Sequence, residues 1–293
     1  MARAHPILPF IAAAGGIATF SMMDATMKGA SIAAGVYSAL LLRCAFGTVL
    51  MLPVWLLSGA RWPGRNVLQV HLLRSAVVSG MALLFFWGLV RIPIAEAIAL
   101  SFIAPLIALY LAAVLLGEMI QPKAIAASML GLSGVLVIAI ARVASGTLGE
   151  QSGLGIGAVL ASAVLYAWNL VLQRQQAQIA GPQEIALFQN LLVATILGLA
   201  APWFLHWPGA TALRDIALAA ALAGISLLLL SWAYARAEAQ ALVPVEYTGF
   251  IWAALFGWLK FGEQVTWATL AGVVLIIVGS WIAARRPSQL TAL

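Results

Sequence analysis

Charged residues and cysteine are both scarce in this chain. Asp, Glu, Lys and Arg make up 8% of the 293 residues, whereas about a quarter of the residues of a typical soluble domain are charged. The single cysteine, Cys44, excludes an internal disulfide. The three histidines, His5, His71 and His206, show no spacing typical of a metal-binding motif. This composition argues against an ordinary soluble domain, and we expect no metal or other cofactor.

Long apolar runs take the place of the missing charge, because hydrophobic residues make up 64% of the chain. A membrane-spanning helix needs about 20 mainly apolar residues. The sequence predicts ten such helices, near residues 7–27, 34–58, 70–90, 94–116, 124–141, 154–173, 183–205, 212–235, 239–261 and 266–284. The runs are too long for the strands of a membrane barrel and lack their alternation. The predicted fold class is an all-α integral membrane protein in a lipid bilayer.

The same set of residues occurs twice in the chain at a constant spacing. Each member of the first set is found again 145 positions later; the sets are Trp87, Arg91, Gly117, Glu118 and Gly134, and Trp232, Arg236, Gly262, Glu263 and Gly279. This duplication predicts two repeats, residues 1–145 and 146–293, with five helices each. Because an odd number of spans reverses the chain direction, the second repeat should lie inverted relative to the first. Inverted repeats are typical of secondary transporters.

Basic residues exceed acidic ones, which gives a net charge of +6. They are scattered among the helix ends and form no basic stripe, so nucleic acid is not expected as a partner. Arginines gather between Arg61 and Arg74 and at Arg285 and Arg286. Cytoplasmic loops of membrane proteins carry an excess of basic residues, so both termini are predicted to be cytoplasmic. The apolar run after Arg3 is interpreted as a retained first helix rather than a signal peptide.

Motifs of membrane enzymes are missing from the sequence. Such enzymes usually show paired acidic motifs, a His-Glu-x-x-His helix or a nucleophile elbow, and none of these occurs. Gly153, Gly155 and Gly157 form a run that could suggest phosphate binding, but they open a membrane helix and follow no strand. Close helix packing is the preferred interpretation of these glycines. The protein is not expected to be an enzyme.

Two segments of the chain share a longer pattern. Residues 99–118, ALSFIAPLIALYLAAVLLGE, and residues 243–263, VPVEYTGFIWAALFGWLKFGE, are apolar helices that contain proline and end in Gly-Glu. They resemble the signature helices of the EamA-type branch of the drug/metabolite transporter superfamily, and the resemblance extends over essentially the whole chain. It implies ten transmembrane helices in two inverted five-helix repeats and a central cavity between them. It also implies export or exchange of small metabolites, commonly amino acids, across a bacterial inner membrane.

The two segments differ in a way that suggests a division of labour between the repeats. Pro244 lies earlier in its segment than Pro105 does, and Glu246 stands where Ser101 aligns. The prolines and the two Gly-Glu pairs are assigned to helix geometry. These residues are Pro105, Pro244, Gly117, Glu118, Gly262 and Glu263.

Charged residues inside the predicted helices are candidate functional residues, because a charge in hydrocarbon is costly unless it meets a partner or a cavity. Asp24 and Lys28 are one helical turn apart, so we expect them to pair on one face near the outer surface. Arg43 in the second helix either joins Asp24 or meets a substrate carboxylate. Together the three residues form a candidate gate or a structural ion pair.

Glu246 is the leading candidate for a substrate contact. It follows Pro244, whose missing N–H frees a nearby carbonyl, and its carboxylate suits a substrate ammonium or a coupling proton. The structural alternative is a hydrogen bond that fixes Tyr247, Asn169 or a neighbouring helix. Aromatic rings are expected to line the cavity, with core packing as their alternative role. The candidate substrate-binding residues are Glu246, Tyr247, Trp87, Trp232, Trp252, Ser101 and Asn169.

These observations predict a secondary transporter that exports amino acids or related small metabolites by alternating access, with protons as candidate coupling ions. The alternative cargo is a nucleobase, a vitamin, S-adenosylmethionine or a cationic drug, because an apolar cavity with one carboxylate suits these compounds as well. A membrane enzyme acting on a lipid-linked substrate and a non-transporting scaffold are two further alternatives.

Overall fold

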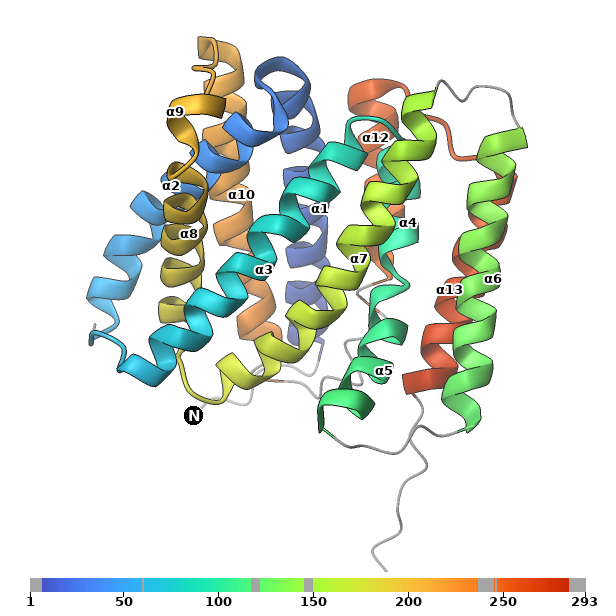
Figure 1. Cartoon of the computed structure of the whole chain (residues 1–293), viewed down its shortest axis with the longest axis horizontal. Helices are drawn as coiled ribbons and strands as arrows, with labels where there is room; N and C mark the ends of the chain where they lie inside the picture. Colours follow the sequence, from blue (N-terminus) through green and yellow to red (C-terminus); the bar gives the residue numbers. More distant parts are fainter. Residues whose placement is uncertain are drawn as a thin grey trace, which may run out of the picture.

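The computed structural model describes residues 7–59, 61–116, 122–144, 150–234, 236, 245 and 247–284, and the regular elements in these ranges are helices. Figure 1 shows a bundle of helices that run between two ends. The helices are α1 (Leu8–Ala34), α2 (Val36–Leu57), α3 (Arg65–Leu89), α4 (Ile94–Ser101), α5 (Ala104–Leu116), α6 (Pro122–Ala144), α7 (Glu150–Ala177), α8 (Pro182–Gly198), α9 (Ala201–Phe204), α10 (Ala210–Tyr234), α12 (Thr248–Phe261) and α13 (Trp267–Ala284). The predicted all-helical fold is confirmed for the described residues.

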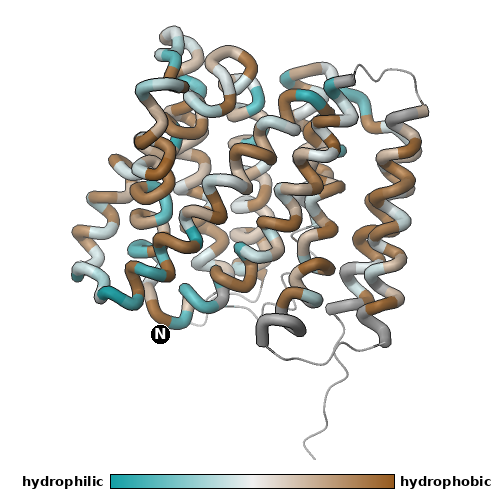
Figure 2. The backbone as a smooth tube through the Cα atoms, viewed as in Figure 1, coloured by the Kyte–Doolittle hydropathy of each residue, from teal (hydrophilic) through white to brown (hydrophobic). Residues whose placement is uncertain are grey.

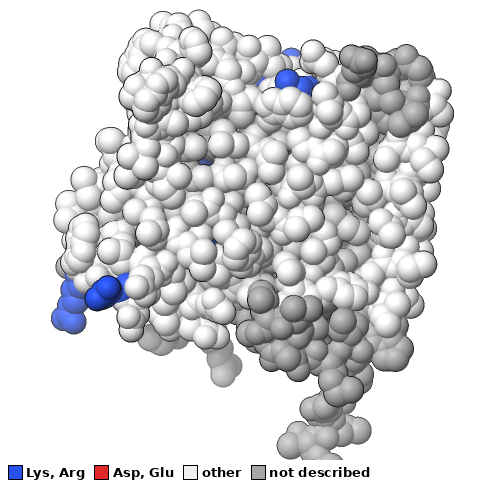
Figure 3. All heavy atoms as spheres, viewed as in Figure 1, with Lys and Arg blue, Asp and Glu red and all other residues white. Residues whose placement is uncertain are grey.

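The surface of the bundle is apolar where a soluble protein would be polar. Large apolar side chains face outward along the helices, with Leu57 89%, Trp267 86% and Leu199 75% exposed. The outer helices are coloured mainly as hydrophobic in Figure 2, and Lys and Arg are exposed mainly toward the two ends of the face in Figure 3. An apolar belt between charged ends matches a bilayer. The protein is therefore a membrane-embedded, multi-pass protein.

Five helices in the described ranges are long and apolar enough to cross a bilayer. They comprise Leu8–Ala34, Val36–Leu57, Arg65–Leu89, Gln151–Ala177 and Ala210–Ala233. Four shorter apolar helical segments accompany them, comprising Ile94–Ala108, Ser128–Ala141, Thr248–Phe261 and Trp267–Gly279. Two predicted spans are interrupted in the structure, because 94–116 is divided into α4 and α5, and 183–205 is divided into α8 and α9.

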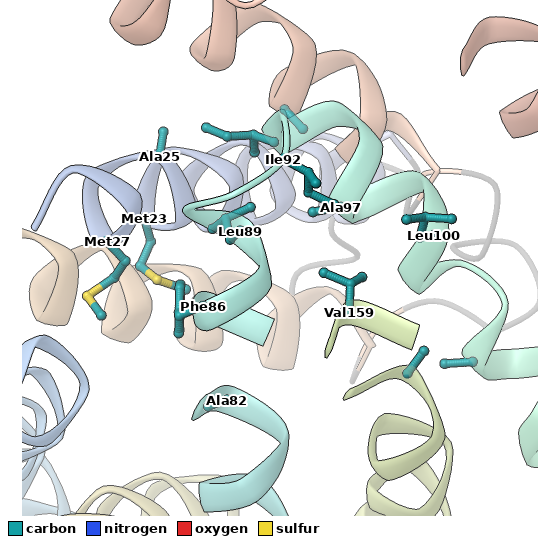
Figure 4. Close-up of a cluster of buried hydrophobic side chains, with 14 of the residues drawn as sticks. Met23, Ala25, Met27, Ala82, Phe86, Leu89, Ile92, Ala97, Leu100 and Val159 are labelled. Carbon is teal, nitrogen blue, oxygen red and sulfur yellow. The ribbon is translucent and has the colours of Figure 1, made fainter. Parts of the chain in front are cut away.

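The main helix pairs join the first part of the chain to the second. Helix α1 packs against α10, α2 against α8, α3 against α7, and α6 against α13. In Figure 1, α1 runs from the lower end of the bundle to the upper end, whereas α7 runs from the upper end to the lower end. The core between these pairs is apolar, and Figure 4 shows Met23, Phe86, Leu100 and Val159 within it.

Glycines let two of these helix pairs approach closely. A Cβ on Gly88 in α3 would lie 2.6 Å from the carbonyl oxygen of Gly155 in α7, and a Cβ on Gly134 in α6 would lie 2.5 Å from that of Gly272 in α13. The packing role predicted for the Gly-x-Gly-x-Gly run therefore holds for Gly155. It does not hold for the two flanking glycines of the run, where a Cβ would meet nothing within 4 Å.

An interruption of the helix separates α4 from α5 near the middle of the bundle. Helix α4 ends at Ser101, and α5 begins at Ala104, directly before Pro105. Pro105 has no N–H to donate to the carbonyl of Ser101 one turn earlier, and its ring crowds that carbonyl. The break is thus placed where the geometric role of Pro105 predicts it.

Gly262 ends α12 as expected from its assignment to helix geometry. Its φ of 66° is left-handed, a conformation that glycine adopts without a Cβ penalty. The Gly262 N–H donates to the Trp258 carbonyl at 2.9 Å, and the Glu263 N–H donates to the Gly257 carbonyl at 3.2 Å. These two bonds satisfy carbonyls that the helix end would leave free.

Gly88→Ala is expected to lower the free energy of unfolding by about 1–3 kcal/mol, because the added methyl group overpacks the interface between α3 and α7. Thermal unfolding of the purified protein in detergent measures the effect. Gly157→Ala in α7, the other helix of this interface, is the matched control. A Cβ at Gly157 meets nothing within 4 Å, and alanine is the better helix former. Equal unfolding temperatures for the two variants would contradict the tight contact.

Candidate functional site

Two aromatic rings meet where one helix is interrupted and another begins. Phe102 follows the end of α4, Tyr247 precedes α12, and their ring centroids lie 5.3 Å apart with the planes at 89°. The two residues are 145 positions apart, which is the spacing of the sequence repeat. Equivalent positions of the two copies therefore touch each other. Such a contact marks the centre about which the two copies are arranged.

Backbone groups near this centre are not used by a continuous helix. The break after α4 leaves the carbonyl of Ser101 without the N–H that Pro105 lacks. The hydroxyl of Ser101 donates to the Ala97 carbonyl at 2.8 Å, so this predicted substrate-binding residue is hydrogen-bonded to its own helix. Interrupted helices at membrane depth supply backbone polar groups for substrates or ions in many transporters.

Two hollows adjoin this contact, one through Ile103 and the other through Tyr247. The first has a volume of about 310 Å³ and includes Ile103, Leu106, Tyr110 and Leu132 in its wall. The second has a volume of about 250 Å³ and is lined by Tyr247, Ile277, Val278 and Trp281. Leu132 and Ile277 are again 145 positions apart, so the two hollows occupy related places. Their walls are mainly apolar, and lining side chains such as Leu132 (49% exposed) and Trp281 (45% exposed) show that the hollows are open rather than enclosed.

The tryptophans predicted to line a common cavity are divided between different sites. Trp252 lies in α12 and stacks on Phe256 with centroids 6.2 Å apart, one turn after the centre. Trp87 lies near the end of α3, where the guanidinium carbon of Arg91 is 3.4 Å from its ring centroid.

Trp232 repeats the arrangement of Trp87 near the end of α10. The guanidinium carbon of Arg236 lies 4.2 Å from the centroid of its ring. Because α3 and α10 end at opposite ends of the bundle (Figure 1), the two rings do not share one cavity. An arginine over a tryptophan face is a cation–π contact that shields the ring from ligands. We therefore correct the prediction of a shared cavity for these two rings.

Lys28 and Glu263 form a buried ion pair that links distant parts of the chain. The Lys28 Nζ lies 2.5 Å from the Glu263 Oε1, with side chains 7% and 15% exposed. The Lys28 ammonium also donates to the Ile92 carbonyl at 2.7 Å. The other Glu263 oxygen accepts the backbone N–H of Ile94 at 2.7 Å, at the start of α4. We call these contacts the Lys28–Glu263 bridge.

The Lys28–Glu263 bridge corrects two predictions. The sequence pairs Lys28 with Asp24 one turn away, whereas the structure pairs it with Glu263. Glu263 was assigned to turn geometry, but its carboxylate also caps the first turn of α4, where the helix dipole favours negative charge. The bridge joins α1 and α4 of the first part of the chain to the turn after α12 of the second.

Arg74 is a buried residue whose role the sequence did not reveal. It is 6% exposed and lies in α3. Its Nε donates to the Asn169 Oδ1 at 2.9 Å, its Nη1 donates to Gln176, and its Nη2 donates to Gln173 at 3.3 Å. We call these four residues the Arg74 network. Asn169 therefore joins two helices by a hydrogen bond, as polar side chains often do between membrane helices.

His71 extends the contacts around the Arg74 network. Its Nε2 is 3.0 Å from the Glu184 Oε1, its Nδ1 contacts the amide of Gln176, and its ring stacks on Phe188 with centroids 5.2 Å apart. These contacts tie α3 to α7 and α8 at the lower end of the bundle in Figure 1, opposite the Lys28–Glu263 bridge. Arg74 offers a weak sequence signal, because it is a charged residue within the apolar run 70–90.

Asp24 is a buried charge and Arg43 a half-buried one, and no ion pair joins them among the described residues. Asp24 is 2% exposed, and its Oδ2 has no hydrogen-bond partner among the described residues. The Nε of Arg43 is likewise buried without a partner, and its Nη2 lies 3.6 Å from the Cys44 Sγ.

Four predicted residues lie outside the described residues. They are Glu246, Pro244, Gly117 and Glu118. Their assignments remain predictions from the sequence.

Glu263→Gln is expected to destabilise the protein by about 3 kcal/mol, because the buried Lys28 ammonium loses the negative charge beside it. Asp215→Asn is the control: Asp215 lies 3.6 Å from Lys260, but both side chains are about one third exposed, so its loss should cost about 0–1 kcal/mol. Thermal unfolding in detergent compares the two variants. If Glu263→Gln is as mild as the control, the bridge does not contribute the stability that its geometry implies.

Comparison with known proteins identifies the family of the chain. Residues 8–140 and 153–285 each match the EamA-like transporter family. The pseudopaline exporter CntI of Pseudomonas aeruginosa (strain UCBPP-PA14) is 30% identical over 265 residues, which cover 89% of this chain and 90% of that protein. A riboflavin transporter of Rhizobium johnstonii is 28% identical over 229 residues, which cover 76% of this chain and 71% of that protein.

A solved crystal structure supports the shared fold. It aligns with a TM-score of 0.64 at 21% identity and covers 94% of this chain and 96% of the other. The two family matches begin at residues 8 and 153, and this offset equals the 145-residue spacing of the repeat. Two family domains thus account for most of the chain, which belongs to the EamA-like transporter family and is a small-molecule transporter rather than an enzyme.

Proposed function

We propose that this protein exports amino acids or related zwitterionic metabolites by alternating access about the Phe102–Tyr247 contact. The observation that carries the proposal is the meeting of equivalent positions of the two copies at the break between α4 and α5 and at the start of α12. Two copies arranged about a shared centre can expose that centre to one side or the other by rocking. The apolar hollows beside the centre would take the apolar part of a substrate.

An inverted arrangement of two five-helix repeats is part of this proposal. Its support is the exchange of partners between the copies: α1 packs on α10 and α7 packs on α3, which are the same pair after a shift of one repeat. The opposite directions of α1 and α7 in Figure 1 agree with inversion. The ten predicted spans would then be the five long helices, the shorter apolar helices and the interrupted segments between them.

Glu246 retains its proposed role as a contact for a substrate ammonium or a coupling proton. It precedes Tyr247, which lies in the central contact. A carboxylate side chain inside the membrane can change its protonation state as its surroundings change during transport. Ser101 and Trp252 remain proposed neighbours of the substrate, because both lie within a few residues of the central rings.

Gating is proposed for the two ends of the bundle. The Lys28–Glu263 bridge closes one end, and the Arg74 network closes the other, so each would open in turn. The bacterial inner membrane with both termini cytoplasmic is the proposed location. Its support is the arginine distribution, because α3 begins with Arg65 at the same end of the bundle at which α1 begins (Figure 1).

A vitamin is the second candidate cargo, because one relative is named a riboflavin transporter. The relative named a pseudopaline exporter supports outward transport. Uptake by proteoliposomes of labelled amino acids, nucleobases and vitamins, with empty liposomes as control, tests the proposal. Saturable flux of an amino acid supports it. Saturable flux of another compound alone overturns the cargo, and no flux of any compound contradicts the proposal.

Glu246→Gln is expected to abolish flux driven by a pH gradient while exchange of substrate across the membrane continues, because glutamine binds a substrate but cannot release a proton. The measurement compares gradient-driven flux with exchange in the same proteoliposomes, and a protonophore that collapses the gradient serves as control for the unaltered protein. Gradient-driven flux that the variant retains in full would show that Glu246 carries no coupling proton.

A further inference from the structure

We infer that Asp24 and Arg43 together bind the charged head group of a zwitterionic ligand, with its ammonium at the Asp24 carboxylate and its carboxylate at the Arg43 guanidinium. The inference rests on the proposed function and places the polar part of the ligand in the first repeat. It differs from the predicted gate, in which these residues pair with each other or with Lys28.

The first step is the state of the two side chains. Asp24 is 2% exposed, and its Oδ2 has no partner among the described residues. The buried Nε of Arg43 has none either. Native proteins rarely leave buried polar atoms unpaired, because each costs the desolvation of that group. One unpaired acceptor and one unpaired donor, of opposite charge and on the packed helices α1 and α2, are the two halves of a site for a bridging group.

The second step is that the fold does not require this pair of charges. The positions 145 residues later hold Asn169 and Phe188. Asn169 accepts a hydrogen bond from Arg74, and Phe188 packs in an aromatic cluster with Trp55. Equivalent positions in the second repeat are thus filled by a neutral amide and a ring. The charges at Asp24 and Arg43 are specific to the first repeat.

The third step is the depth of the two residues. Asp24 lies ten residues before the end of α1, and Arg43 lies seven residues after the start of α2. At a rise of 1.5 Å per residue they lie about 15 Å and about 10 Å from the turn at Gly35 that joins the helices. With a hydrocarbon core of about 30 Å, both lie well inside the membrane.

The fourth step connects the pair to the centre of the molecule. Ser21, one turn before Asp24, donates to the Gly249 carbonyl at 3.4 Å. Gly249 lies two residues after Tyr247, in the first turn of α12. The face of α1 that carries Asp24 therefore adjoins the helix that begins at the central contact. A ligand with its head group at Asp24 can direct its apolar part toward the central rings.

A zwitterion explains both unpaired groups, whereas the simpler occupants explain one. A proton on Asp24 would neutralise the carboxylate but leave the Arg43 donor unpaired. A cation without a carboxylate would do the same, and an anion would leave Asp24 unpaired. A molecule that carries an ammonium and a carboxylate a few ångströms apart satisfies both, which is the chemistry of an α-amino acid head group.

Binding to the full-length protein in nanodiscs tests the assignment by calorimetry with three compounds. L-Leucine carries both charged groups, isoamylamine lacks the carboxylate, and 4-methylpentanoate lacks the ammonium. Asp24→Asn, which installs the residue of the equivalent position 169, should weaken L-leucine binding by about 30-fold or more and leave 4-methylpentanoate unaffected. Arg43→Met should weaken L-leucine similarly and leave isoamylamine unaffected. Asp215→Asn, which removes a carboxylate near the surface, should change none of these affinities.

The outcomes separate this inference from the proposed function. If both variants bind L-leucine as tightly as the unaltered protein, the assignment of the head-group site is wrong. That result does not contradict the proposed transport of amino acids. If the unaltered protein carries a different amino acid, that amino acid and its amine and acid analogues replace the L-leucine series. If it binds and carries only compounds that are not zwitterions, both the inference and the proposed cargo fail.

Thermal unfolding without ligand gives a second, independent result. A pair kept for a ligand should not stabilise the empty protein, because buried charges that lack partners are a cost. The double variant Asp24→Asn with Arg43→Met should therefore unfold at the same or a higher temperature than the unaltered protein. A clear fall in its unfolding temperature, beyond that of Asp215→Asn, would identify the pair as a structural contact and overturn the inference.

Discussion

Lipid offers no hydrogen-bond partner to the backbone, and this constraint governs the rest of the structure. It requires the described segments to be helices, and it permits an interruption only where protein surrounds the freed polar groups. The break between α4 and α5 meets this condition, because it lies against the start of α12 through the Phe102–Tyr247 contact. Helices interrupted in this way offer polar groups inside an apolar protein, which is what a membrane transporter needs in order to bind a cargo with charged or polar parts.

The same constraint explains why the few buried charges of the bundle have specific partners. Lys28 reaches Glu263 at one end of the bundle, and Arg74 reaches Asn169 and Gln176 at the other. The residues at positions 24 and 28 of α1 can be compared with those 145 residues later in α7. Asp24 corresponds to Asn169, and Lys28 corresponds to Gln173, both in the Arg74 network. One repeat carries charges and the other carries amides. The division of labour suggested by Glu246 and Ser101 thus extends to a second pair of positions.

The sequence predicts the helical fold well because membrane helices and repeats are recognised from patterns of residues along the chain. Run length and apolar content predict where helices cross, and the recurrence of Gly262 and Glu263 predicts a turn. Contacts between residues far apart in the sequence could not be predicted in this way. Lys28 and Glu263 are separated by 235 residues, and the rule that residues one turn apart interact pairs Lys28 with Asp24 instead. The burial of Arg74 was missed for a related reason, because α3 begins at Arg65, five residues before the predicted span, and carries Arg74 inside the bundle.

Distances between spin labels measured by pulsed electron paramagnetic resonance test alternating access most directly. With Cys44 replaced by alanine, one label pair at Ile32 and Trp267 reports on the end with the Lys28–Glu263 bridge, and a second at Asn66 and Ile179 reports on the end with the Arg74 network. The account predicts that one distance lengthens while the other shortens when transported substrate or a pH gradient is supplied. Distances that both stay constant, or that lengthen together, would contradict it.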